Sequence, residues 1–349
     1  MDNLFTISTS PIVIAGPCSV ENSFQLCSTV EALSRDSRIA MIRCGVWKPR
    51  THPGGFEGLG EPALHWISDL KRQHPHLHFC CEVARPEHIE MCQRYGIEAV
   101  WIGARTSVNP FAMGELAAAL RGSAMAVMVK NPIIPDIELW VGAIERIQQA
   151  GIEDLAAIHR GFSTYNNYSY RNNPLWEIPI ELKRRMPTLP LLCDPSHIGG
   201  RRDLVAPISQ MALDLHFDGL MVEVHNDPDN ALTDSHQQIT PEQFGQMLDK
   251  LKQRHDSETA PSELQRLRDH LDVIDQQLLK LLSQRMEISR QIGAIKHQNN
   301  MPIFQPQRWE QVLAQQQKAG AALGLDDHFV KEIAEKIHRE SLRMQEEIQ

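Results

Sequence analysis

The sequence has no long hydrophobic run. Nowhere do eighteen uncharged apolar residues follow one another, and the N-terminal MDNLFTISTS has neither a basic start nor an apolar stretch, so the features of a membrane span and of a secretory signal are both missing. A basic excess is missing as well: the formal net charge of the 349 residues is -9 at pH 7, which argues against a broad nucleic-acid-binding face. We therefore expect a cytoplasmic protein that binds neither membranes nor nucleic acid.

Paired cysteines are also lacking. The seven cysteines are an odd number, lie within the first 200 residues and show no CxxC spacing. This pattern predicts reduced thiols, most of them buried, and not a disulfide framework.

What the sequence does contain is a repeated alternation of two patterns. Eight short apolar runs are separated by helix-length amphipathic stretches such as residues 23–34 and 86–95. The runs are 12–16, 40–45, 78–83, 99–104, 126–131, 155–161, 190–197 and 219–225. Eight such alternations predict a (β/α)8 TIM barrel, and the near-continuous apolarity of the runs fits parallel strands buried on both faces. A doubly wound open sheet is the structural alternative. Because the first run begins close to Met1, no regulatory domain is expected before the barrel.

The texture of the sequence changes after residue 253. Residues 254–261 are polar and aperiodic, which predicts a linker. From Ser262 apolar residues repeat at helical spacing to about His297, a second helix is expected from about Gln307, and Asp326 or Asp327 can cap a third. We expect a barrel domain over 1–253 and a small all-α domain of three helices over 262–349. Three helices cannot bury such an apolar stripe alone, so a homodimer through them is expected.

Polar residues of the barrel fall near the C-terminal ends of the expected strands, where catalytic residues of such barrels lie. One group consists of Cys18, His197, Glu223 and Asp234. A thiolate, an imidazole and two carboxylates suit one divalent metal ion such as Mn2+, Fe2+, Co2+ or Zn2+ better than Mg2+. For Cys18 alone, a small buried hydrophobic residue is the alternative.

A second group near the strand ends is cationic. Its members are Arg43, Lys48, Arg50, Arg105, Lys130 and Arg160, with Thr51 as a hydroxyl donor. Six cations at one barrel mouth would repel one another, which predicts phosphate and carboxylate ligands. A surface ion pair is the alternative for any single arginine.

Five motifs occur in order: AGPCSVE (15–21), KPRT (48–51), GAR (103–105), DPSH (194–197) and VEVH (222–225). With these motifs, residues 10–250 resemble the 3-deoxy-D-arabino-heptulosonate 7-phosphate (DAHP) synthases, in the subgroup close to the octulosonate synthases. The resemblance implies condensation of phosphoenolpyruvate with erythrose 4-phosphate, the first step of the shikimate pathway. Two features differ from the octulosonate synthases. KPRT stands where those enzymes typically have KANR, and Cys18 stands where their metal-free members have asparagine. Another phosphoenolpyruvate-dependent synthase, such as an octulosonate phosphate synthase, remains the alternative.

The resemblance also implies residue roles. The metal ligands would be Cys18, His197, Glu223 and Asp234; Lys48, Arg105, Lys130 and Arg160 would hold phosphoenolpyruvate; Arg50 and Thr51 would take the aldose phosphate. Glu82, at the end of the third strand, and metal-bound water are candidates for proton transfer.

The helical domain carries basic residues where its pattern expects apolar ones. Arg285 continues the series 264, 271, 278, and Lys296, eleven residues later, shares its face. Arg268 is seventeen residues before Arg285, about 100° round the helix, and could serve a partner chain. In the last helix Ser341 and Gln345 lie four residues apart on the continued stripe. A dimerising helical hairpin with snorkelling basic stems is the alternative.

Residues 262–349 are similar to the all-helical chorismate mutases. The pattern comprises Arg268, Arg285, Lys296, Arg308, Ser341 and Gln345. The resemblance implies rearrangement of chorismate to prephenate, with Arg268 of the dimer mate and Arg285 gripping the carboxylates, and Lys296 and Gln345 donating to the ether oxygen. At the contact to the substrate hydroxyl, Trp309 stands where the family commonly has Glu and Gln305 where Asp is frequent. A module that senses chorismate or prephenate and controls the barrel is the alternative.

Overall fold

The computed structural model describes residues 3–7, 10–48, 54–165, 169–252 and 262–346. The chain divides into two compact units, Met1–His255 and Asp256–Gln349. The expected linker, residues 254–261, lies entirely outside the described residues, so the domain limits stay a prediction.

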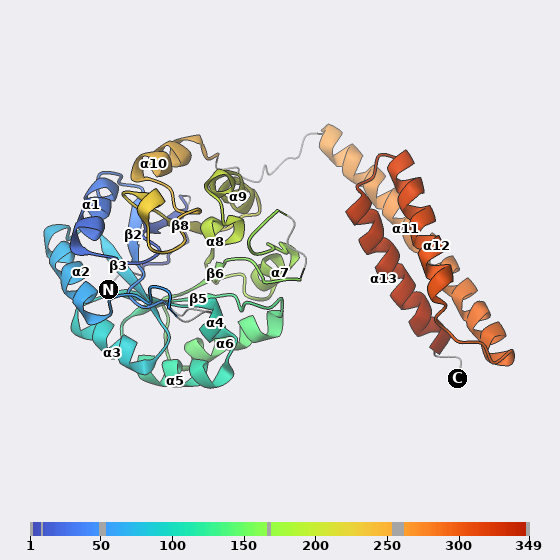
Figure 1. Cartoon of the computed structure of the whole chain (residues 1–349), viewed down its shortest axis with the longest axis horizontal. Helices are drawn as coiled ribbons and strands as arrows, with labels where there is room; N and C mark the ends of the chain where they lie inside the picture. Colours follow the sequence, from blue (N-terminus) through green and yellow to red (C-terminus); the bar gives the residue numbers. More distant parts are fainter. Residues whose placement is uncertain (1–2, 8–9, 49–53, 166–168, 253–261, 347–349) are drawn as a thin grey trace. The chain divides into compact units, whose positions relative to one another are not determined.

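The first unit is a closed barrel of eight parallel strands in sequence order (Figure 1). The strands are β1 (Ile12–Gly16), β2 (Ile39–Cys44), β3 (His78–Val83), β4 (Ala99–Ile102), β5 (Ala126–Lys130), β6 (Leu155–His159), β7 (Leu191–Cys193) and β8 (Gly219–Glu223). Pairing of β1 with β8, from Ile12 opposite Gly219 to Gly16 opposite Glu223, closes the sheet. The predicted (β/α)8 barrel is thereby confirmed, and the open sheet is excluded.

Helices surround the strands in alternation with them (Figure 1). They are α1 (Ser23–Leu33), α2 (Glu61–Gln73), α3 (Pro86–Arg94), α4 (Ala104–Ser107), α5 (Pro110–Leu120), α6 (Ile137–Gln149), α7 (Glu177–Arg185), α8 (Pro195–Gly199), α9 (Arg202–Asp214), η1 (Pro228–Asn230) and α10 (Pro241–Lys250). Their starts follow local chemistry: the Asn22 side chain accepts a hydrogen bond from the Gln25 amide at 2.9 Å, and Thr240 opens α10 with a capping box. These caps fix where each helix leaves its loop.

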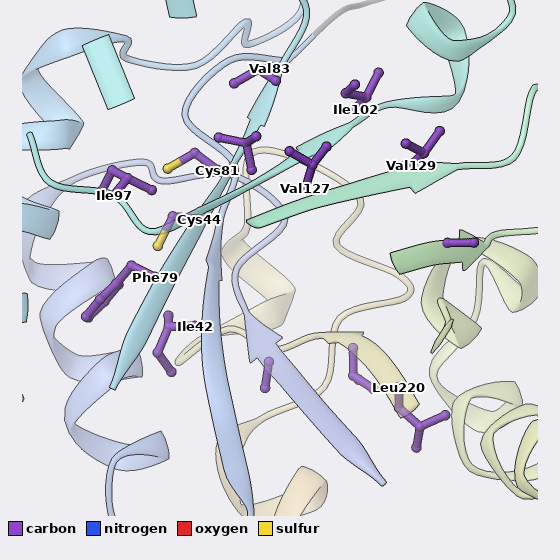
Figure 2. Close-up of a cluster of buried hydrophobic side chains, with 14 of the residues drawn as sticks. Ile42, Cys44, Phe79, Cys81, Val83, Ile97, Ile102, Val127, Val129 and Leu220 are labelled. Carbon is purple, nitrogen blue, oxygen red and sulfur yellow. The ribbon is translucent and has the colours of Figure 1, made fainter. Parts of the chain in front are cut away.

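Two apolar layers result from the alternation of side chains along each strand. Figure 2 shows the outer layer, in which Ile42, Phe79 and Val127 point from the strands toward the helices. The inner layer fills the barrel and includes Met41, Trp101 and Met128. On β2, the residue two places after Met41 shares its inward face, and this places Arg43 inside the barrel near the carboxyl ends of the strands.

The second unit consists of three helices, as predicted: α11 (Ser262–Gln298), α12 (Pro306–Ala322) and α13 (Asp327–Glu346). Pro306 stands at the first position of α12, where its missing N–H costs nothing. Both α11 and α12 pack on α13. The first half of α11 stays exposed, with Leu271 at 59 % and Leu278 at 52 %. In the part of the chain that the structure describes, no helix has the length and apolarity needed to cross a membrane.

Candidate active sites in the barrel and on the helices

Three of the four predicted metal ligands form a compact group at the carboxyl ends of β1 and β8. One ligand atom each from Cys18, Glu223 and Asp234 lies within 4.8 Å of the others, and Cys18 Sγ is 3.2 Å from Asp234 Oδ2. The register of β1 and β8 explains the proximity, since Gly16 pairs with Glu223 and Cys18 follows two residues later.

The fourth predicted ligand, His197, adjoins this group. It lies in α8, directly after β7, and its Nε2 is 3.7 Å from Glu223 Oε1. Its Nδ1 lies 2.8 Å from Asp194 Oδ2. A carboxylate behind one imidazole nitrogen holds the other nitrogen in place, so Asp194 aims His197 Nε2 at the group.

The sequence did not indicate two polar residues that hydrogen-bond the carboxylates of the predicted metal ligands. Arg171 donates to Asp234 Oδ1 at 2.9 Å and to Gln237 Oε1 at 2.6 Å. Gln237 in turn donates to Glu223 Oε2 at 2.6 Å. Both residues lie in loops without periodicity, so no sequence signal marked them.

Two predicted anion-binding cations are paired with carboxylates of the barrel itself. Arg43 is fully buried, with Nη2 3.1 Å from Glu223 Oε1 and its guanidinium 5.1 Å from the Trp101 ring centroid. Lys130 Nζ donates to Asp194 Oδ2 at 2.6 Å. Asp194, a residue of the DPSH motif for which no role was expected, therefore neutralises part of the positive charge. The expectation that the cations need external anions is incomplete for this reason.

The remaining cations differ in burial. Lys48 is buried, with Nζ 3.8 Å from Glu82 Oε2. Arg160 is buried and donates to Asn172 Oδ1 at 2.8 Å. Arg105, in α4, is exposed. Arg50 and Thr51 lie outside the described residues.

Burial and charge together set the protonation of this site. Burial lowers the pKa of Arg160 to about 10, with Arg171 and Arg105 adding to the shift against Asp194, so Arg160 remains charged at neutral pH. Burial alone would raise the pKa of Asp194, but His197, Lys130 and Arg43 outweigh it and hold the pKa well below its usual range. The site thus presents fixed carboxylates and fixed cations side by side.

The predicted residues of the helical unit meet where α11 faces α13. Arg285 hydrogen-bonds the Ser341 hydroxyl, and Lys296 Nζ donates to Gln345 Oε1 at 3.1 Å. Gly293 allows this approach, because a β-carbon there would come within 2.9 Å of the Gln345 Cα.

Three further predicted residues lie outside this cluster. Gln305 is the N-cap residue of α12 and Arg308 is exposed on its first turn. Arg268 is exposed on α11, seventeen residues before Arg285, which is about 25 Å along the helix axis. Arg268 therefore cannot reach the Arg285 cluster of its own chain.

One aromatic pair beside this cluster was not anticipated. The rings of Trp309 and His338 stack with centroids 4.1 Å apart and planes 13° apart. His338 precedes Ser341 by three residues and Gln345 by seven, so the three side chains share one face of α13.

A closed parallel barrel with buried cations and carboxylates at its strand ends is typical of enzymes that act on small anionic substrates. Residues 8–259 match the family model described as the DAHP synthetase I family, and the chain belongs to this family. A phospho-2-dehydro-3-deoxyheptonate aldolase of Thermotoga maritima is 32% identical over 245 residues, which are 70% of this chain and 70% of that protein. A crystal structure of that aldolase, a DAHP synthase, covers 76% of this chain and 71% of its own, with 30% identity and a TM-score of 0.62.

The second unit matches a different family. Residues 267–346 match the model described as chorismate mutase type II. A T-protein of Enterobacter agglomerans is 35% identical over 80 residues, which are 23% of this chain and 21% of that protein. The chain is thus a bifunctional enzyme with a DAHP synthase domain and a chorismate mutase domain, and these matches do not favour a second unit that only senses.

Proposed function

We propose that the barrel condenses phosphoenolpyruvate with erythrose 4-phosphate at the carboxyl ends of its strands. The observation that carries this proposal is the juxtaposition of the Cys18, Glu223 and Asp234 group with the buried cations Arg43, Lys130 and Arg160. One half of the site suits a metal ion and the other half suits phosphate and carboxylate groups.

The residues present fit a divalent metal ion. Glu223 Oε1 is buried and, apart from its ion pair with Arg43, accepts no hydrogen bond from the described residues, so it keeps a lone pair for a cation. Sulfur, imidazole and carboxylate donors together favour Mn2+, Fe2+, Co2+ or Zn2+. Cys18, His197, Glu223 and Asp234 would hold the ion, which when bound supplies a Lewis acid for the aldehyde oxygen.

The protein's own residues would do the positioning. Lys48, Lys130, Arg105 and Arg160 would fix the phosphate and carboxylate of phosphoenolpyruvate so that its C3 faces the aldehyde carbon. Arg43, buried beneath them, contributes positive charge and holds Glu223. Arg50 and Thr51 would bind the phosphate of the aldose. Glu82, close to Lys48 Nζ, would transfer a proton when water adds to C2 and phosphate leaves.

For the helical unit we propose rearrangement of chorismate to prephenate between α11 and α13. Arg285 and Ser341 would bind a carboxylate, and Lys296 and Gln345 would donate to the ether oxygen as its bond breaks. No nucleophile or proton transfer is needed, so preorganised donors suffice. Arg308 would assist in binding the dianionic substrate, and Gln305 would lie near its hydroxyl.

We also propose that two copies form a homodimer through the helical units. Leu271, Leu278 and Leu281 leave an apolar stripe on α11 uncovered, and such a stripe is stable in water when a second copy covers it. A second copy would also supply its Arg268 to the site, because Arg268 of the same chain lies too far from Arg285.

Steady-state rates with two aldose phosphates test the barrel assignment. Consumption of phosphoenolpyruvate should be much faster with erythrose 4-phosphate than with arabinose 5-phosphate. The reverse preference would mean that the barrel makes an octulosonate phosphate instead.

A further inference from the structure

We propose that His338 is a substrate-contacting residue of the helical site and that it hydrogen-bonds the ring hydroxyl of chorismate. The inference rests on the proposed mutase function and adds a residue to it. Position 309 offers no acceptor for this contact, because the only polar group of Trp309 is the indole N–H donor, and its ring stacks flat on the His338 ring.

The position of His338 is the first support. It lies on the same face of α13 as Ser341 and Gln345, both of which contact basic residues of α11. Helical geometry places His338 one turn before Ser341. A substrate held by Arg285 and Lys296 would therefore lie against the His338 ring.

The unsatisfied nitrogen of His338 is the second support. Its Nε2 is shielded from solvent, and no hydrogen-bond partner for it exists among the described residues. A polar nitrogen shielded from solvent without a partner is unfavourable, and a bound hydroxyl would remove that penalty. The stack on Trp309 and the tilted contact with Phe304, 5.9 Å between centroids, restrict the ring to one plane.

The chemistry of the neighbours is the third support. Arg285 and Lys296 can only donate hydrogen bonds, and the Gln345 amide oxygen already accepts from Lys296. Burial lowers the pKa of His338, and the charges of Arg285 and Lys296 lower it further. A neutral imidazole can accept a hydrogen bond from the hydroxyl or donate one to its oxygen, whereas the cations beside it can only donate.

Turnover of two substrates tests the inference. The variant His338→Phe keeps the aromatic stack and loses the nitrogen, and His338→Gln keeps a polar group without the ring. We expect His338→Phe to lower kcat/KM for chorismate by about tenfold or more, with His338→Gln less affected. Neither variant should change kcat/KM for a chorismate analogue that lacks the ring hydroxyl.

His328→Phe is the matched control, since His328 lies at the exposed start of the same helix, and it should leave both substrates unaffected. The synthase rate of each preparation shows that the variant protein is intact. An equal loss on both substrates, or no loss on either, would overturn the role of His338 while leaving the mutase in place. A wild-type protein that turns over neither substrate would instead overturn the mutase function itself.

Discussion

Gly103 lies directly against the carboxylate of Glu82, so that a β-carbon at position 103 would overlap Glu82 Oε1. Glu82 ends near Lys48, with Oε2 3.8 Å from Nζ. The absence of a side chain at Gly103, in the GAR segment, therefore leaves room for Glu82, the proposed proton-transfer group, beside Lys48, a proposed substrate-binding cation.

Replacing Gly103 by Ala should displace this carboxylate. We expect the synthase kcat to fall about 10- to 100-fold, because a shift of about 1 Å in a reacting group has effects of that size. The end of the Glu82 side chain can move, so the thermal midpoint should change little. Gly114→Ala is the control, since nothing lies within 4 Å of a β-carbon there. Equal synthase rates in both variants would remove Glu82 from the mechanism.

Gln237 should affect the affinity for the metal ion. It donates to Glu223 Oε2 at 2.6 Å, and loss of a group that orients a ligand typically weakens metal binding about 10- to 100-fold. An equilibrium titration of Gln237→Met with Mn2+ or Zn2+ should show this loss. Gln246→Met, on the exposed face of α10, should bind as the wild type does. Unchanged affinity in Gln237→Met would place the ion elsewhere.

His159 should make the barrel less stable in acid. It is fully buried among aromatic rings, including Trp176 with centroids 5.3 Å apart, and burial lowers its pKa from 6.5 to about 3. Below pH 6.5 the unfolded chain takes up a proton that the folded chain does not, so stability falls by about 1.4 kcal/mol per pH unit until the folded pKa is reached. Above pH 6.5 this contribution is constant.

Urea unfolding at pH 7 and pH 5 measures this dependence. Between pH 7 and pH 5, the free energy of unfolding of His159→Phe should fall by about 2 kcal/mol less than that of the wild type. His76→Phe, an exposed position, should keep the wild-type slope. A His159→Phe protein with the wild-type slope would show that other groups cause the acid sensitivity.

Arg268 should act in the site of the partner chain. Arg268→Ala and Lys296→Met should each abolish chorismate turnover as pure proteins. After unfolding and refolding as a mixture, about a quarter of the sites would combine an intact Arg268 from one chain with an intact Lys296 from the other. Mutase activity should return to about that fraction of wild type. A mixture as inactive as its parents would contradict the shared site.

The sequence predicted those features that depend on local patterns. Each strand is a mostly apolar run, and the proximity of Cys18 and Glu223 follows from strand ends that a closed barrel must bring together. The three helices of the second unit likewise follow from apolar spacing and from Pro306. The family resemblance assigned metal-binding and substrate-binding roles to residues that periodicity alone does not distinguish from other polar residues.

Interactions between loops were not predictable in this way. Arg171 and Gln237 meet Asp234 and Glu223 only because two aperiodic loops fold over the same strand ends. His338 reads in the sequence as one more residue of an amphipathic helix. Its significance depends on the Trp309 ring of another helix, which no spacing rule connects to it.

The most direct test of the whole account is one preparation assayed for two reactions. Consumption of phosphoenolpyruvate with erythrose 4-phosphate and loss of chorismate should be measured with and without a chelator. We predict that both reactions proceed and that the chelator stops only the first, because the proposed metal ligands belong to the barrel and the proposed helical site would work by hydrogen bonds and charge. The account would be contradicted if the chelator left the synthase rate unchanged, or if no chorismate were consumed in the absence of the chelator.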